Sequence, residues 1–293
     1  MKKLLMLIVF SLLFTFTPLV PPAGAETNPS VKGKETIPVN IMSYNIHHGV
    51  GTDSQLDLGR IANVIKENGA EIIGLQEVDK HYGARSNFED QTKKIAKLLG
   101  YNHYVYGANL NLEPNIGDTK RREYGTAIIS KYPIIKSTNT FLTSVGEQRG
   151  LLHATVNVKG YHVQVYNTHL GLDEASRTTQ IEEIITESTK FEGPSVLMGD
   201  FNTTPETAEI QKLLTGSKFI DSFSGIDAPY TFPVPNPIKQ IDYIFTSDFI
   251  NIANQRVLFT EASDHLPIIT TIELSKVKTV SYQGTVFYLF WMI

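Results

Sequence analysis

The sequence contains no cysteine in its 293 residues, and several other features are missing as well. Without cysteine there are no disulfide bonds, so the stability of the fold must come from a packed core. No glycine/serine-rich or proline-rich linker and no internal repeat divides the chain, which favours one domain. The lack of a low-complexity stalk gives no support to an adhesive or structural role.

Basic residues are fewer than acidic ones, with 26 Lys and Arg against 30 Asp and Glu and a formal net charge of −4. Removal of Lys2 and Lys3 with an N-terminal signal would leave 24 basic against 30 acidic residues, a charge of −6. Nucleic-acid-binding surfaces are basic, so nucleic acid is not favoured as a partner. A nuclease that uses metal ions as its local positive charge is not excluded.

The first residues are typical of an export signal. Lys2 and Lys3 precede the apolar run 4–20, and the small residue Ala25 precedes the expected cleavage site. We therefore predict that residues 1–25 are a cleaved signal peptide and that the mature protein is secreted or extracytoplasmic, with no stable membrane span. A retained anchor is the alternative, because the run is near the lower limit of about 17 residues for crossing a bilayer. The prolines at its end favour cleavage.

Strand-like and helix-like hydrophobic periods alternate in the next part of the chain. A strand at 39–46, a helix at 56–69, a strand at 70–78 and a helix at 89–100 follow one another, and both helical patterns end at a glycine. This order is the opening of an α/β protein.

The remaining chain is richer in strands. Two further helices are expected, one at 174–190 and one beginning near Pro205, where Thr204 can cap the N-terminus. The expected strands cover residues 124–130, 151–158, 161–170, 195–199, 240–247, 255–259 and 266–274. These elements predict an α/β fold, a layered sandwich of two mixed β-sheets flanked by helices.

Polar side chains follow the apolar strands repeatedly. They are Asn45, Glu77, Asn167, His169, Asp200, Asn202, Asp242, Asp264 and His265. Each alone is ordinary at a strand end or turn. Their recurrence predicts a site gathered at one edge of the sheets.

Seven segments also carry a resemblance to a known family. They read "SYNIHHG", "GLQEVD", "EYGTAIIS", "YNTHLG", "MGDFNTTP", "IDYIF" and "SDHLPI", within residues 39–274. In this order they resemble the exonuclease/endonuclease/phosphatase superfamily, which includes deoxyribonucleases, apurinic endonucleases, inositol polyphosphate 5-phosphatases and secreted sphingomyelinases. The resemblance implies a four-layered sandwich and a catalytic domain over residues 37–275.

The resemblance implies a magnesium site and a histidine that acts on the phosphate. Glu77 would be the principal Mg²⁺ ligand, with Asn45 and Asp264 near the same ion, because Mg²⁺ prefers hard oxygen ligands. Mn²⁺ or Ca²⁺ are alternatives. His265 would contact the scissile phosphate or activate water, with Asp242 behind it to fix its tautomer.

The same resemblance assigns roles around the attacking water and the leaving group. Asp200 would align or deprotonate the water, and Asn202 would bind a phosphoryl oxygen. His169 would face the leaving group, paired with Glu123, and Asn167 would donate a hydrogen bond to the phosphate.

Several residues near these motifs have less distinctive contexts. Arg85, Arg149 and Arg177 are candidates for substrate contact or for orienting other groups, because guanidinium suits bidentate phosphate binding. A purely structural arginine is an equal alternative. His47 and His48 follow Asn45 in the chain and could border the site, but we expect instead that one of them packs and the other faces solvent.

These features together predict a monomeric, secreted, metal-dependent phosphoesterase that uses water to cleave phosphodiester or phosphomonoester bonds. A nuclease and a sphingomyelinase-like phospholipid phosphodiesterase are the alternatives for its substrate. A non-catalytic binding module would have lost Glu77, Asp200 or His265, and all three are present.

The C-terminal tail, residues 276–293, lies beyond the resemblance and holds the single tryptophan. Its apolar end is too short to span a bilayer. An added strand, an aromatic segment that touches membranes and an unstructured end are all compatible with its sequence.

Overall fold

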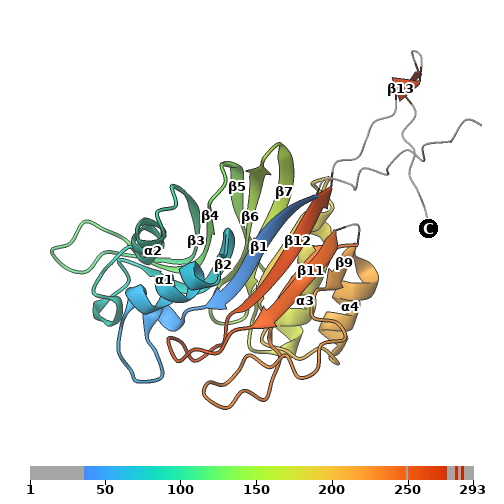
Figure 1. The fold of residues 1–293 in the computed structure, drawn as a ribbon. Helices are drawn as coiled ribbons and strands as arrows, with labels where there is room; N and C mark the ends of the chain where they lie inside the picture. The colour runs from blue at the N-terminus through green and yellow to red at the C-terminus, as the bar shows by residue number, and fades with distance from the viewer. Residues whose placement is uncertain (1–35, 249, 276–280, 283–284, 287–293) are drawn as a thin grey trace, which may run out of the picture. The chain divides into compact units, whose positions relative to one another are not determined.

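The computed structural model describes residues 36–248 and 250–275, together with the short strands at 281–282 and 285–286. In this part of the chain two six-stranded sheets and four α-helices are found (Figure 1). The predicted α/β sandwich of two mixed sheets is thereby confirmed. The predicted signal peptide, residues 1–25, lies outside the described residues.

The first sheet has the strand order β11-β12-β1-β2-β4-β3. Its strands are β1 (Thr36–Asn45), β2 (Ile72–Lys80), β3 (His103–Leu112), β4 (Arg122–Ser130), β11 (Asn251–Val257) and β12 (Ile268–Ser275). Only β1 and β2 pair in parallel in this sheet.

The second sheet has the order β5-β6-β7-β8-β10-β9, with β7 and β8 as its parallel pair. Its strands are β5 (Ile134–Leu142), β6 (Arg149–Val158), β7 (Tyr161–His169), β8 (Ser195–Asp200), β9 (Phe219–Asp221) and β10 (Asp242–Ser247). Each sheet is therefore mixed.

The helices are α1 (Leu58–Glu67), α2 (Gln91–Leu99), α3 (Glu174–Ser188) and α4 (Ala208–Gly216). Aspartate side chains cap the first three by accepting backbone N–H bonds. The predicted start of the fourth helix near Pro205 is wrong. Thr207 N donates to Thr204 O, so these residues form a turn, and the helix begins at Ala208.

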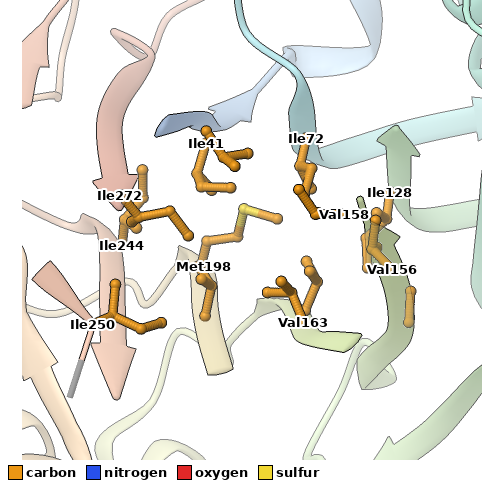
Figure 2. Packing of buried hydrophobic residues seen from close by; sticks show 14 of the residues in the cluster. Ile41, Ile72, Ile128, Val156, Val158, Val163, Met198, Ile244, Ile250 and Ile272 are labelled. Atoms are coloured by element: carbon orange, nitrogen blue, oxygen red, sulfur yellow. The ribbon is translucent and has the colours of Figure 1, made fainter. Parts of the chain in front are cut away.

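The core is divided by the alternation of side chains along each strand. In β1, Ile41 faces the other sheet, whereas Met42 packs in the cluster that includes α1 and α2. In β8, Val196 and Met198 face the first sheet, and Leu197 packs with α3 and α4. Figure 2 shows side chains of both sheets meeting around Met198. The layers are therefore helix, sheet, sheet and helix.

Gly199 lies beside Thr168 in the β7–β8 pair and has a φ of +150°. A Cβ at this position would come 2.1 Å from the backbone oxygen of Thr168. We expect Gly199→Ala to lower the free energy of unfolding by about 2–4 kcal/mol, measured by urea denaturation.

The matched control is Gly83→Ala. Gly83 has extended backbone, and nothing lies within 4 Å of the position that a methyl group would take there. The free energy of unfolding of this variant should therefore stay within about 0.5 kcal/mol of wild type. Equal stability of the two variants would contradict the close approach at Gly199.

In the tail, β13 (Ser281–Tyr282) and β14 (Thr285–Val286) pair with each other. The rest of residues 276–293 lies outside the described residues, so the alternatives for the tail stay open. None of the described helices is long and apolar enough to cross a membrane.

Candidate active site

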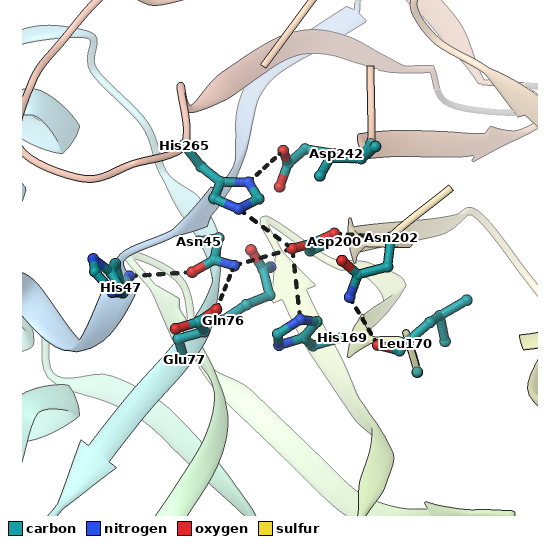
Figure 3. Close-up of polar contacts among 12 residues, drawn as sticks. Asn45, His47, Gln76, Glu77, His169, Leu170, Asp200, Asn202, Asp242 and His265 are labelled. Atoms are coloured by element: carbon teal, nitrogen blue, oxygen red, sulfur yellow. Dashed lines mark hydrogen bonds and ion pairs between the residues drawn. The ribbon is translucent and has the colours of Figure 1, made fainter. Parts of the chain in front are cut away.

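Strand ends of both sheets bring polar side chains together. His169 lies beside Asp200 in the β7–β8 pair, and Asp200 lies beside Asp242 in the β8–β10 pair. From the first sheet, β1 ends at Asn45, and β2 carries Glu77 near its own end. Figure 3 shows these side chains directed toward one another. The structure therefore gathers most of the predicted polar residues at one edge of the sandwich.

His265 is held between two buried aspartates. Its Nδ1 lies 2.9 Å from Asp242 Oδ2, and its Nε2 lies 3.7 Å from Asp200 Oδ2. Burial lowers the pKa of His265, but the charges of Asp242 and Asp200 outweigh burial and raise it to about 10. Burial, and after it the charge of Asp242, raises the pKa of Asp200 to about 7. The cluster thus joins an imidazolium to a carboxylate that can exchange a proton near neutral pH.

His169 approaches Asp200 from the opposite side. Its Nε2 lies 3.5 Å from Asp200 Oδ2, and its Nδ1 lies 3.2 Å from Arg149 Nη1. Burial, and then the charge of Arg149, lowers the pKa of His169 well below its usual value. The ring is therefore neutral, and because Arg149 donates to Nδ1, the ring proton is on Nε2. Arg149, which also pairs with Glu147 at 2.8 Å, orients this histidine.

Asn45 connects the two halves of the site. Its Nδ2 donates to Glu77 Oε1 at 3.1 Å and to Asp200 Oδ2 at 3.0 Å. Its Oδ1 accepts from the backbone N–H of His47, and its backbone oxygen accepts from Ser263 Oγ. The role of Asn45 as a metal ligand stays a prediction, since a carbonyl oxygen has a second lone pair.

Glu77 sits at a β-bulge between Leu75 and Val78, with a φ of +56°. Left-handed backbone at a non-glycine residue costs about 1–3 kcal/mol, and such strain gathers at functional sites. Burial raises the pKa of Glu77, and the charge of Asp264 raises it further. A bound cation would relieve this repulsion between carboxylates.

His47 and His48 border the site, which is the less expected of the two alternatives that the sequence left open. Both residues have left-handed φ values, 44° and 43°, and one ligand atom from each lies within 4.8 Å of a Glu77 carboxylate oxygen. Burial, followed by the charges of Arg85 and His47, lowers the pKa of His48 to about 4. The closeness of both histidines to Asn45 in the chain was the one signal that could have pointed to them.

Asn202 lies at the mouth of a cavity. Its backbone N–H donates to Asp200 Oδ1 at 2.9 Å, and its Nδ2 donates to Leu170 O, which leaves one amide hydrogen for a ligand. The cavity of about 340 Å³ is lined by Asn202, Thr203, Thr204, Phe232, Lys239 and Ile241. The ring centroids of Phe232 and His265 lie 4.7 Å apart, so the cavity adjoins the polar cluster.

The predicted contact of Asn167 with phosphate is wrong in this structure. Its Nδ2 donates to the backbone oxygens of Leu75 and Ala127, and its Oδ1 accepts from Gln76 Nε2 at 2.7 Å. Both amide hydrogens are therefore used, and Asn167 joins the two sheets beneath the site.

The predicted pairing of His169 with Glu123 is also wrong, because Glu123 pairs with Lys80 at 2.8 Å across β2 and β4. Arg85 pairs with the buried Asp79 at 2.7 Å. Arg177 pairs with Glu209 and donates to the Leu172 carbonyl. Both arginines thus follow the structural alternative.

Comparison with known proteins agrees with this arrangement. The sequence profile described as "Endonuclease/Exonuclease/phosphatase family" matches residues 42–265. The chain belongs to this family. It therefore has the hydrolase fold that the sequence motifs led us to expect.

One relative of this chain is protein cwh43 of Schizosaccharomyces pombe, 29% identical over 163 residues, which are 53% of this chain and 15% of cwh43. The chain thus spans a small part of that relative. The endonuclease/exonuclease/phosphatase of Beutenbergia cavernae has a TM-score of 0.70 at 23% identity, covering 81% of this chain and 72% of its own. The mannosyl-6-phosphatase of Bacteroides thetaiotaomicron has a TM-score of 0.66 at 19% identity, covering 80% and 99%.

Metal dependence is typical of this family, and two groups of side chains could hold a divalent ion. They are His47, His48 and Glu77, and Asp200, Asp242 and His265. The first group fits an ion well, because the Nδ1 atoms of both histidines are buried without a hydrogen-bond partner. In the second group, His265 Nδ1 is already hydrogen-bonded to Asp242, so this nitrogen is not free to bind an ion.

The charge of Asp242 can be tested through the titration of His265. In Asp242→Asn the hydrogen bond to Nδ1 can persist, but the larger of the two aspartate charges that raise the pKa of His265 is gone, while that of Asp200 remains. We expect the pKa to fall from about 10 toward the ordinary value of 6.5, because less negative charge then opposes the effect of burial. The His265 ring resonances, followed by NMR against pH, measure it.

This shift also predicts a change in stability. A histidine whose folded pKa exceeds its unfolded value stabilises the fold fully below pH 6.5, and this contribution is lost as the pH rises to about 10. The free energy of unfolding should fall less over this window in Asp242→Asn than in wild type. Asp53→Asn, which changes an exposed carboxylate paired with Arg60, should behave as wild type. The same fall in all three proteins would contradict the assignment.

Proposed function

We propose that this protein is a metal-dependent phosphoesterase that cleaves its substrate by in-line attack of water. One observation carries the proposal: Asn45 bridges Asp200, which lies among two histidines, and Glu77, which lies among two others. A proton-handling group and a cation-binding group therefore stand on either side of a single amide. Such an arrangement suits a phosphoryl group under attack by water, because one side can handle the proton and the other can neutralise the phosphoryl oxygens.

Each buried residue has a role that follows from its protonation. Asp200 orients the water and accepts its proton, because its raised pKa makes it a better base than an ordinary aspartate. The His265 imidazolium, held by Asp242, stabilises negative charge on the phosphoryl oxygens. Neutral His169 donates a hydrogen bond from its Nε2–H to the leaving oxygen or to Asp200. A divalent ion at Glu77 would neutralise the phosphoryl oxygens when bound.

The cavity next to Asn202 favours a compact polar alcohol as the leaving group. Phe232 offers a flat ring and Lys239 a cation, and the volume of about 340 Å³ is within the range of small-molecule sites. The fold neighbour named as a mannosyl-6-phosphatase makes a sugar phosphate the first substrate to try. A nucleoside phosphate also presents a ring and an anion.

We further propose that the enzyme acts outside the cytoplasm. The sequence supports this through the basic residues Lys2 and Lys3, the apolar run that follows, and Ala25 before the expected cleavage point. Expression of the full chain in an exporting host, followed by mass spectrometry of the product, should find a mature N-terminus at Glu26. An intact N-terminus on the exported protein would contradict cleavage.

A substrate panel tests the proposed activity. The protein lacking residues 1–25 is incubated with mannose 6-phosphate, a chromogenic phosphodiester, DNA, RNA, sphingomyelin and inositol phosphates. Each assay is run with Mg²⁺, with Mn²⁺ and with chelator. We expect phosphate-ester cleavage with a metal ion and none with chelator, and faster turnover of the compact esters than of DNA or sphingomyelin.

Asp53→Asn serves as the active control in this panel, since its exposed carboxylate pairs with Arg60 away from the polar cluster. No cleavage of any substrate with metal present would contradict the phosphoesterase assignment and favour a binding module. Equal turnover with chelator would contradict metal dependence alone.

A further inference from the structure

Two histidines next to Glu77 have no role in the mechanism above. His47 and His48 form a short 3₁₀ turn after β1, and their rings lie with centroids 4.5 Å apart. The Nδ1 atoms of both rings are buried and lack a hydrogen-bond partner. A buried ring nitrogen without a partner costs free energy unless a ligand satisfies it.

Carboxylate groups lie close to these two rings, although the charge of Arg85 also acts on His48. One ligand atom each from His47, His48 and Glu77 lie within 4.8 Å of one another. His47 Nδ1 also lies 3.8 Å from Asp264 Oδ1. Two atoms bound to one ion are separated by at most about 4.2 Å, twice a metal–ligand distance of about 2.1 Å, so small side-chain movements suffice.

The donor types of this group differ from those that Mg²⁺ prefers. Mg²⁺ takes oxygen ligands and retains several waters, whereas imidazole nitrogen suits first-row transition ions. Two imidazoles with one carboxylate is a donor set found in catalytic zinc sites and non-haem iron sites.

We infer that His47, His48 and Glu77 bind a first-row transition-metal ion, such as Mn²⁺ or Zn²⁺, in preference to Mg²⁺. Asp264 adds a carboxylate beside His47. The inference deepens the proposed function, because this ion would be the one that phosphoester cleavage uses. It differs from the expectation of an oxygen-only magnesium site built on Glu77, Asn45 and Asp264, and the metal preference measured below decides between them.

The test removes both imidazoles without disturbing the backbone. Asparagine tolerates positive φ better than most residues, so His47→Asn/His48→Asn preserves the left-handed turn. The matched control is His103→Asn/His162→Asn, which removes two imidazoles from β3 and β7. Both of these histidines lie at the strand ends opposite to those that form the site. Circular dichroism verifies that each variant is folded.

Two measurements test metal binding by the protein directly. Isothermal titration calorimetry gives the affinities for Mn²⁺ and Mg²⁺, and pulsed EPR of bound Mn²⁺ detects ¹⁴N coupling from ligated imidazole. We expect wild type and the control to bind Mn²⁺ at least about 100-fold more tightly than Mg²⁺ and to show ¹⁴N coupling. The His47/His48 variant should lose the coupling and bind Mn²⁺ about 100-fold more weakly, with little change for Mg²⁺.

Wild-type Mn²⁺ binding without ¹⁴N coupling, or equal Mn²⁺ affinity in the two double variants, would overturn the inference. If hydrolysis still occurs in that case, the proposed function stands. Nitrogen-ligated Mn²⁺ in a wild-type protein that cleaves no phosphate ester would instead overturn the proposed function and leave the metal site intact.

Discussion

Replacing His265 by asparagine should reduce kcat/KM for phosphate-ester cleavage by about 10³-fold, with the fold intact. The asparagine amide can still donate to Asp242 in place of Nδ1, so the buried carboxylate keeps a partner. What is lost is Nε2 and the positive charge beside Asp200. Because that charge acts on the phosphoryl oxygens in the transition state, the loss should fall mainly on kcat.

His265→Ala is a harsher form of the same change. It also leaves Asp242 unpaired and removes the ring that lies against Phe232, so it should lose stability as well as activity. The active control is Asp53→Asn. Near-wild-type turnover by a folded His265→Asn protein would remove this histidine from the mechanism.

Much of the site could be predicted from the sequence because its motifs lie at the ends or starts of apolar strands. "MGDFN" and "SDHLPI" place Asp200 and His265 directly after or before buried strands, and the strands deliver them to one edge. The family resemblance implied the pairing of His265 with Asp242, and Asp242 lies at the start of its own strand. Such predictions need only strand ends and a common sheet edge.

The position of Asn167 could not be predicted from strand ends alone. It shares a face of β7 with His169 because side chains two residues apart point the same way. Two residues also correspond to about 6.6 Å along a strand. Asn167 therefore lies about this far from the sheet edge, in the space between the two sheets. Gly74 opposite leaves room for it, since a Cβ there would come 3.0 Å from Asn167 Cγ. No pattern within one strand reveals that depth.

The strands that the sequence did not reveal have weak alternation. The exposed edge strand β5 reads "IIKSTNTFL", with a run of polar residues where a half-buried strand would alternate. β3 contains Gly107 and two asparagines, which are typical of turns, and β9 has only three residues. Pairing with neighbouring strands forms these elements despite their composition.

Local backbone strain likewise could not be predicted from the sequence. His47, Glu77 and Asn202 all have positive φ, although non-glycine residues adopt such a conformation only uncommonly. Glycine would have signalled a left-handed turn, but these residues also carry the chemistry. The bulge at Glu77 arises only when β2 pairs with β4, so it depends on contacts far apart in the chain.

Asp200→Asn is the second change with a large expected effect, about 10³-fold in kcat. The amide is nearly the same size but cannot accept the proton of water. It also cannot accept from both Asn45 Nδ2 and the Asn202 N–H, because one carboxylate oxygen becomes a donor. The variant therefore loses the proton acceptor and also weakens the hydrogen bonding that connects Asp200 to Asn45.

The matched control is Asp221→Asn, a carboxylate on β9 whose pKa burial also raises and which accepts from the backbone of Phe223. It should keep near-wild-type kcat, because it lies outside the polar cluster and contacts neither His265 nor Asn45. Comparing kcat for the two variants over pH 5–9 separates a role of Asp200 in proton transfer from the general effect of replacing a buried aspartate.

The wild-type rate should rise as Asp200 loses its proton near pH 7, since only the ionised carboxylate can act as a base. If Asp200→Asn keeps that rise, the proton acceptor is a different group, and His265 in its neutral form becomes the candidate.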